Sequence, residues 1–287
     1  SAPNNVGWVA NPSSNPDGAA REIWGARANK PGAAWRLAEG NNPELAPDGS
    51  SVLYVNNGQI YRARVGPGAA TTPTDKGEKP FITAWGTNSG PRWSPDGSKI
   101  AFASDRTNHS FIGIYDLRTR SVTFVSPGVD RDTNPLWLPD GKRLVTGGFL
   151  LDDNTTFTYS NWDMSTTGKE HQISSFQVSL PARIIDGAAN PEATLVGTLS
   201  EDGTVKILDL TTGKVTLTFK PPEPIENAVD VSMLASGPRL TTISKNKELI
   251  IWDVESGKKI TSLPEFPGTV MVVNFSPDGS QMIVIQD

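Results

Sequence analysis

The chain has 287 residues, a formal net charge of −5 and no cysteine. An acidic surface repels phosphate groups, so we expect no nucleic-acid partner, and the missing cysteines exclude disulfides and zinc–thiolate sites. The longest apolar runs are only as long as β-strands, so no membrane-spanning segment is expected. The first residues lack the basic and apolar stretches of a signal peptide, and nothing in the sequence indicates the localisation of the protein.

Short strands separated by turns are predicted from the first residues onward. Three strand candidates occur near the N-terminus, at residues 7–10, 21–27 and 34–38. Proline presets φ, aspartate accepts a hydrogen bond from the backbone two residues on, and glycine tolerates positive φ, so a strand followed by Pro-Asp-Gly and a second strand predicts a tight hairpin. This pattern recurs in four segments: 43–55, 91–103, 135–147 and 273–285.

A second motif has the period of a structural repeat. It consists of an aromatic or apolar residue, an aspartate, an apolar residue and a polar turn, and its aspartates are Asp116, Asp163, Asp209 and Asp253. These aspartates are 47, 46 and 44 residues apart, which is the length of one four-stranded propeller blade. We therefore interpret them as turn-forming residues of successive blades.

The number of blades follows from the repeat starts, which fall near Pro43, Pro91, Pro135, Ala182 and Ala228. Five internal blades leave about residues 1–42 and 269–287, and neither end is sufficient for a blade of its own. We predict an all-β protein with one domain over residues 1–287, a six-bladed β-propeller of four-stranded antiparallel sheets. Pairing of the N- and C-terminal strands would close the ring and protect the sheet edges. Seven blades are the alternative, because the two ends together exceed one blade.

The two halves of the chain resemble different propeller families. The hairpins of the first half, most clearly residues 91–105, resemble the propeller repeats of TolB and of the prolyl oligopeptidase family. From about Ala182 onward the sequence resembles WD repeats, as at residues 249–253, although the Gly-His dipeptide typical of those blades is missing. These resemblances imply an architecture and no single function. The change between the halves is compatible with drift within one propeller or with joined fragments of two propellers, natural or engineered.

Catalytic motifs are missing from this pattern. The resemblance to prolyl oligopeptidases implies a Ser-Asp-His triad on a separate α/β-hydrolase domain with a G-x-S-x-G nucleophile elbow, and that pentapeptide does not occur in the 287 residues. At most, the resemblance implies the gating propeller of such an enzyme. The only histidines are His109 and His171, whereas metal-dependent propeller enzymes need several converging histidines or acids. We predict no catalytic residue, no cofactor and no metal ligand.

Trp85 and His109 are the candidate partner contacts. Trp85 does not belong to the repeat, and His109 lies in a predicted turn at residues 105–110, where a ligand at the propeller mouth would reach it. The alternative for His109 and for His171 is an exposed residue in a turn or at a sheet edge without a functional role. Other tryptophans occupy repeated positions and are expected to pack inside blades: Trp93, Trp137, Trp162 and Trp252.

Three loops are weaker candidates. The acidic loops 130–132 and 152–154 supply the oxygen ligands that calcium prefers, although without the spacing of a dedicated calcium loop. The Pro-rich segment 220–227 is expected to be a stiff loop between blades, with a protruding docking loop as the alternative.

With no assembled catalytic constellation, the sequence favours a non-enzymatic binding or scaffolding module. Its partner would be a protein, a peptide or a glycan bound on the loop face or at the channel mouth, and we expect a monomer. The alternatives are a metal-dependent hydrolase or lyase with its site in the central channel, and an engineered hybrid propeller without biological activity.

Overall fold

The protein is all-β throughout the residues that its computed structural model describes, which are 5–10, 22–27, 35–65, 79–125, 131–150, 153–166, 171–190, 192, 194–263, 270–275 and 282–286. These residues form strands and turns without any helix, and hence without a helix long and apolar enough to span a membrane. The chain divides into two compact units. Unit 1 comprises residues 1–148 and 160–174, and unit 2 comprises residues 149–159 and 175–287.

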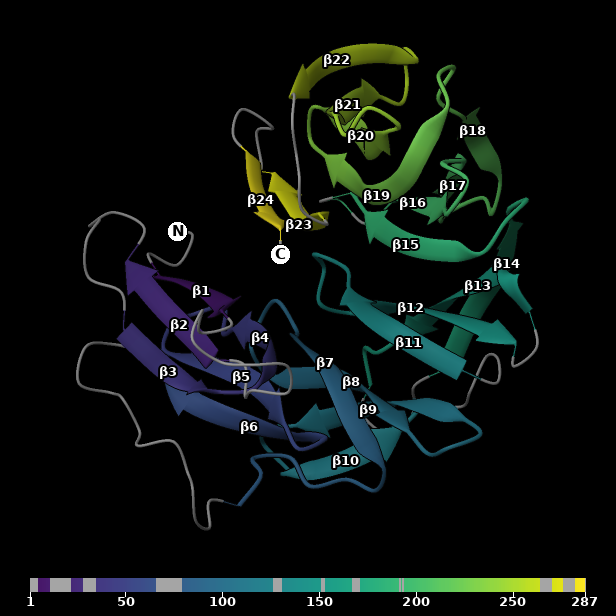
Figure 1. Ribbon diagram of the computed structural model, residues 1–287. Coiled ribbons are helices and arrows are strands. Elements are labelled where there is room, and N and C mark those ends of the chain that lie inside the picture. The colour runs from purple at the N-terminus through teal and green to yellow at the C-terminus, as the bar shows by residue number, and fades with distance from the viewer. Residues whose placement is uncertain are drawn as a thin grey trace. The chain divides into compact units, whose positions relative to one another are not determined.

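Unit 1 begins with two three-stranded antiparallel sheets (Figure 1). The first contains β1 (Asn5–Ala10), β2 (Glu22–Arg27) and β3 (Trp35–Glu39), so the three strands predicted near the N-terminus are confirmed. The second contains β4 (Asn41–Leu45), β5 (Ser51–Asn56) and β6 (Gln59–Arg64). Ile82 forms an isolated bridge to Ile60 at the outer edge of this sheet, in the place of a fourth strand.

Two groups of four strands follow. The first group is antiparallel and contains β7 (Thr87–Trp93), β8 (Lys99–Asp105), β9 (Ser110–Asp116) and β10 (Ser121–Phe124). The second group contains β11 (Arg131–Trp137), β12 (Arg143–Leu150), β13 (Asp153–Asp163) and β14 (His171–Ser179). One parallel bridge between Arg131 and Ser110 joins the two groups, and β12, β13 and β14 contribute residues to both units.

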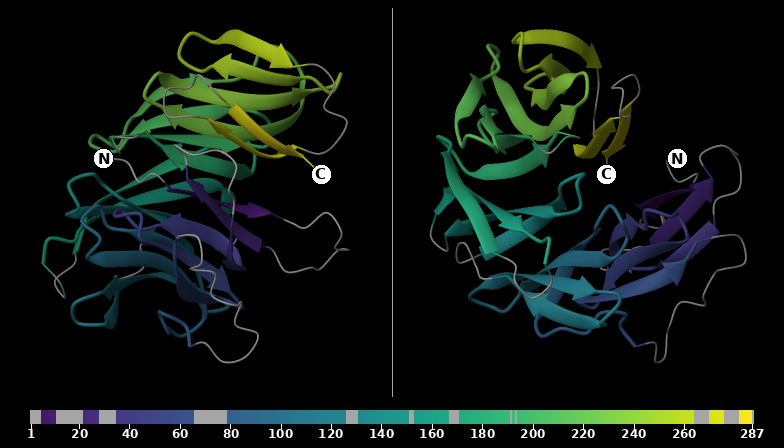
Figure 2. Two further views of the ribbon diagram at one scale, coloured as in Figure 1. Left: turned by 90° about the vertical axis from the view of Figure 1, so that its left-hand side faces the viewer. Right: turned by 180° about the vertical axis from the view of Figure 1, so that it is seen from behind.

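Unit 2 contains two complete four-stranded antiparallel sheets. The first runs in the order β15 (Ile184–Ala189), β16 (Leu195–Ser200), β17 (Val205–Asp209) and β18 (Val215–Phe219). The second runs in the order β19 (Ile225–Leu234), β20 (Gly237–Ser244), β21 (Leu249–Asp253) and β22 (Lys258–Leu263). A hairpin of β23 (Val270–Phe275) and β24 (Met282–Gln286) ends the unit. The edge strands β15 and β19 lie side by side, and Figure 2 shows the sheets from two further sides.

The hairpin turns have the predicted chemistry. The carboxylates of Asp48, Asp96 and Asp140 each accept a hydrogen bond from the backbone N–H two residues on, at 2.9, 3.0 and 2.9 Å. The glycines that follow them have φ of 70°, 70° and 66°, which favours glycine because it has no Cβ. The turn of the fourth predicted hairpin, residues 276–280, lies outside the described residues. The repeated aspartates also accept hydrogen bonds from the backbone of their own turns. The carboxylate of Asp209, for example, accepts the N–H groups of Thr211 and Thr212.

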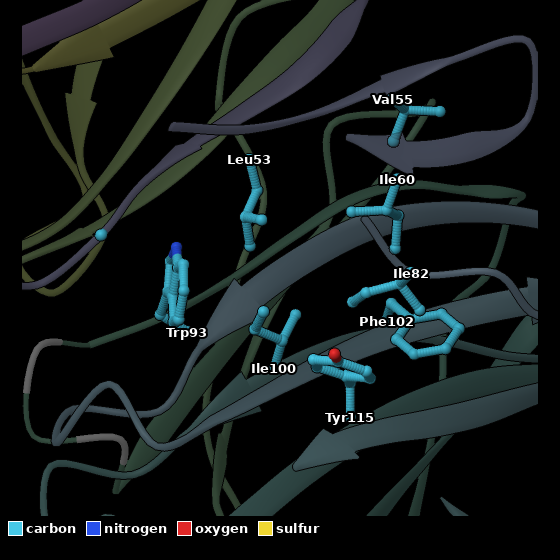
Figure 3. Packing of buried hydrophobic residues seen from close by; sticks show 9 residues of the cluster. Leu53, Val55, Ile60, Ile82, Trp93, Ile100, Phe102 and Tyr115 are labelled. Atoms are coloured by element: carbon cyan, nitrogen blue, oxygen red, sulfur yellow. The ribbon is translucent and has the colours of Figure 1, made fainter. Parts of the chain in front are cut away.

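The cores lie between neighbouring sheets, where the alternating apolar side chains meet. Figure 3 shows one such cluster between β4–β6 and β7–β9 of unit 1; its labelled members are Leu53, Val55, Ile60, Ile82, Trp93, Ile100, Phe102 and Tyr115. The four tryptophans at repeated positions are all buried, so their predicted packing role is confirmed: Trp93, Trp137, Trp162 and Trp252.

The predicted ring closure has no counterpart among the strand ladders of the described residues. β1–β3 form one sheet and β23–β24 form another. The all-β class and the sheets of mostly four antiparallel strands are therefore confirmed, whereas the closed propeller and its six blades stay predictions.

Candidate functional site

Trp85 and His109, the two predicted contact residues, lie at one end of the β7–β10 sheet. Trp85 precedes β7 and His109 lies in the turn between β8 and β9, where the strand register pairs Asp105 with both Thr87 and Ser110. The hydroxyl of Ser104 donates a 2.6 Å hydrogen bond to the carbonyl of Trp85. The side chain of Trp85 is 82% exposed and His109 is also exposed. Both side chains are therefore exposed at the same end of the β7–β10 sheet.

Arg106, which was not selected from the sequence, also lies at this end of the sheet, and two aromatic rings hold its side chain in place. Its guanidinium carbon lies 4.7 Å from the ring centroid of Phe111 and 4.4 Å from that of Phe124, within the range of cation–π attraction. Its Nε is buried and has no hydrogen-bond partner. Among the described residues no carboxylate forms an ion pair with Arg106, so its charge is held in place by aromatic rings and is not neutralised by an acid.

The loop around Arg106 is ordered by its own hydrogen bonds. The N–H of Arg106 donates to the carbonyl of His109 at 2.8 Å, and the carboxylate of Asp105 accepts the N–H of Thr107 at 3.1 Å. Arg131, at the start of β11, donates to the carbonyl of Thr107 at 3.4 Å. We call Trp85, Arg106, His109, Phe124 and Arg131 the rim site. It presents an indole and fixed positive charge together, an arrangement that suits a ligand with an apolar and an anionic group.

Unit 2 contains a second unusual group, a pair of carboxyl groups on its two facing edge strands. Asp186 on β15 accepts the N–H of Val231 on β19 at 2.9 Å, and its carboxyl group is hydrogen-bonded to that of Asp230. Ser232 donates to Asp230 at 2.5 Å. Burial, together with the neighbouring carboxylate of Asp186, outweighs the hydrogen bond from Ser232 and raises the pKa of Asp230 to about 6. Burial also raises the pKa of Asp186. Such a pair retains a proton at a pH where isolated aspartates have already lost theirs.

A buried hydroxyl pair accompanies the carboxyl pair. The hydroxyl groups of Tyr159 on β13 and Thr198 on β16 share a 3.0 Å hydrogen bond. Burial, together with the charge of Asp186, raises the pKa of Tyr159 far above its ordinary value, so Tyr159 stays protonated. Sequence reasoning missed the carboxyl pair because neither aspartate belongs to a motif. Their separation of 44 residues equals that of Asp209 and Asp253, and this periodicity is the feature that would have revealed them.

The Pro-rich segment lines a cleft of about 420 Å³ in unit 2. Residues 220–224 form the loop, whereas residues 225–227 already belong to β19. Lys220 pairs with Asp202 at 2.7 Å across the cleft wall. Partial burial raises the pKa of Asp202, but hydrogen bonds from Lys220, Ser200 and Thr204 outweigh it and hold that pKa well below its usual range. The acidic side chains of this cleft thus either form ion pairs with lysine or arginine side chains or are exposed to solvent.

The remaining candidates do not assemble. Asp132 is only 2% exposed within β11, so its expected place in a solvated loop is wrong. Residues 130 and 152, and the side chains of Asp153 and His171, lie outside the described residues. In the described part of the chain no three histidine or acidic side chains come together as a metal site requires.

Comparison with known proteins links part of the chain to a protein named as a peptidase. No family model matches the chain. The chain is 32% identical over 121 residues to a protein named "Uncharacterized peptidase YuxL" from Bacillus subtilis (strain 168), an alignment that covers 36% of this chain and 16% of that relative. The chain therefore spans only a small part of the relative's length.

This similarity overturns the expectation of a non-enzymatic binding or scaffolding module, because the relative is named as a peptidase and the likeness favours a hydrolase. The expectation was wrong because it took missing motifs, a nucleophile elbow and clustered histidines, as a missing activity. A segment of an enzyme takes part in catalysis without containing the nucleophile when it binds or orients the substrate.

Proposed function

We propose that the chain is the β-propeller part of a peptidase-type hydrolase and that its rim site receives the peptide substrate. The observation that carries the proposal is the 32% identity with a protein named as a peptidase. The regular sequence of hairpins and the sheets of mostly four antiparallel strands support a propeller, which we infer to have six blades. Because no G-x-S-x-G elbow occurs in these residues, the nucleophile would belong to a further segment or to a second chain.

The rim site supports a role in binding peptides. Trp85 is the most exposed large apolar side chain among the described residues, and Phe124, 41% exposed, lies at the same end of the sheet. Exposed aromatic side chains that gather beside polar groups typify surfaces that bind ligands. An unstructured peptide offers both apolar side chains and charged groups, which match this composition.

The proposal is tested by fluorescence anisotropy with short fluorescein-labelled peptides and the purified chain. We expect saturable binding, and we expect Trp85→Ala to weaken it by about tenfold or more, the usual effect of removing a central aromatic contact. Ile260→Ala is the matched control, because Ile260 is 50% exposed on β22 in unit 2 and should not affect affinity. Absence of peptide binding, or equal affinity of the Trp85 variant and the wild type, would contradict the proposal.

The carboxyl pair of unit 2 supports a second candidate, hydrolysis by the chain itself. Asp186 and Asp230 are only partly buried and share a hydrogen bond, and such a pair can activate water with one carboxylate while the other group donates a proton. Turnover of a fluorogenic peptide near pH 6 by the purified chain, abolished in both Asp186→Asn and Asp230→Asn, would support it. A chain without turnover would eliminate this candidate and leave the first unaffected.

A further inference from the structure

We propose that Arg106 anchors a carboxylate of the bound peptide while Trp85 covers the adjacent apolar side chain, so that the rim site selects peptides by their anionic group. This inference rests on the proposed function, since it names the feature of the peptide that the same site recognises.

The guanidinium of Arg106 is preorganised for this role. Phe111 and Phe124 hold it at 4.7 and 4.4 Å from their ring centroids, so its side chain loses little conformational freedom when a ligand binds. A guanidinium is weakly hydrated and its planar donors match a carboxylate bidentately. Since the described residues offer it no acid partner, an incoming carboxylate would meet an unneutralised positive charge.

Close backbone packing fixes Trp85 next to Arg106. Gly86 has a φ of +89°, and a Cβ at this position would overlap the carbonyl oxygen of Asp105 and lie 3.1 Å from Cγ of Arg106. The backbone that follows Trp85 therefore rests against the stem of Arg106. The amide of Gln59 adds a further restraint by donating to the carbonyl of Gly86 at 3.0 Å. A ligand that places a carboxylate on Arg106 therefore lies close to the backbone segment that carries the indole.

The neighbouring charges favour an anion over a cation. Arg131 is exposed and contacts the same loop through the carbonyl of Thr107. Asp105, which precedes Arg106, directs its carboxylate to its own loop by accepting the N–H of Thr107. The rim site therefore attracts anionic ligands even though the whole chain has a net charge of −5.

The test compares one labelled peptide with a free C-terminal carboxylate, the same peptide amidated, and the amidated peptide with one internal glutamate. We expect the wild-type chain to bind the free carboxylate about tenfold more tightly than the amide, a preference typical of a charge-assisted pair, and to lose part of it at high salt. Recovery of affinity by the internal glutamate would identify a side-chain carboxylate as the recognised group, whereas no recovery would identify the C-terminus.

Variants of Arg106 test whether this residue causes the preference for a carboxylate over an amide. Arg106→Gln should abolish the preference for the free carboxylate. Arg106→Lys keeps the positive charge and should retain part of the preference, so that a result is obtained even where one of the two variants fails to fold. Arg118→Gln is the control, because Arg118 is an exposed arginine beyond the opposite end of β9. Equal binding of free and amidated peptides that still depends on Trp85 would overturn this inference and leave the proposed function intact. Persistence of the preference in Arg106→Gln would also overturn it, and absence of any peptide binding would overturn the proposed function itself.

Discussion

Asp186 on β15 and Asp230 on β19 share a hydrogen bond between their carboxyl groups, although their strands are the edge strands of two different sheets. Asp186 adds a second connection between these sheets by accepting the N–H of Val231. Two carboxylates repel each other, so the contact is favourable only while one of the groups holds a proton. The junction of the two four-stranded sheets in unit 2 therefore contains a titratable connection.

We expect this connection to make the stability of unit 2 depend on pH. Burial raises the pKa of Asp230 to about 6, above the value of roughly 3.9 for an unfolded chain. The stabilisation is therefore complete below pH of about 4 and is lost as pH rises through about 6, a change of about 1–3 kcal/mol. Asp230→Asn should remove this loss and make the protein more stable than the wild type at about pH 7.5.

Urea denaturation of wild type and variant across this pH range measures the effect. Asp209→Asn is the control, because hydrogen bonds from Thr212 and Thr211 lower the pKa of Asp209, so its contribution to stability is lost as pH falls instead. Parallel pH profiles for the wild type and Asp230→Asn would show that the carboxyl pair does not titrate in this range.

Trp252 and Trp93 should respond differently to replacement by phenylalanine. The indole N–H of Trp252 donates to Thr242 at 2.9 Å, whereas that of Trp93 is buried without a partner. Trp252→Phe loses volume and a buried hydrogen bond and should cost about 1–3 kcal/mol. Trp93→Phe loses similar volume but removes an unsatisfied donor, so a cost below about 1 kcal/mol is expected. Denaturation midpoints measure both, and a larger loss for Trp93→Phe would contradict the assignment.

Gly113 and Phe102 should be energetically coupled. A Cβ at Gly113 would overlap the ring of Phe102, which is fully buried in the neighbouring strand β8. Gly113→Ala alone should cost about 2 kcal/mol through overpacking. Phe102→Leu makes room, so the double variant should lose less than the two single variants together, by about 1 kcal/mol. Additive losses in this double-mutant cycle would mean that Phe102 moves aside without cost.

Gly86→Ala and Gly90→Ala form a matched pair at the two ends of one short segment. Both glycines have positive φ, at 89° and 56°, but only a Cβ at Gly86 meets neighbouring atoms. Both replacements should cost about 1 kcal/mol for the backbone conformation, and Gly86→Ala should cost about 1–3 kcal/mol more because it separates the loop from Asp105. Peptide anisotropy should show weakened binding for Gly86→Ala alone. Equal affinities of the two variants would indicate that the position of this loop does not matter for the rim site.

The hairpins and the buried tryptophans could be predicted because their determinants are local or periodic. Asp96 needs only Ser98, two residues away, to form its turn, and Trp93 and Trp137 hold the same position in successive repeats. Strand pairing within each sheet follows from such turns, since a short connection leaves an antiparallel neighbour as the only reachable partner.

The rim site and the carboxyl pair depend on contacts that the sequence does not specify locally. His109 and Trp85 were selected individually, but their common location follows from the register of β7, β8 and β9, and Arg106 becomes an isolated cation only when Phe111 and Phe124 close around it.

An all-β chain of hairpins that recur at the length of a propeller blade can be predicted from the amino-acid order, because turn chemistry and the alternation of apolar residues act over a few residues. Which side chains share an environment depends on the folding of the whole chain, as for Asp186 and Asp230 on neighbouring edge strands. Desolvation and charge coupling depend on distance in space and not on separation along the chain.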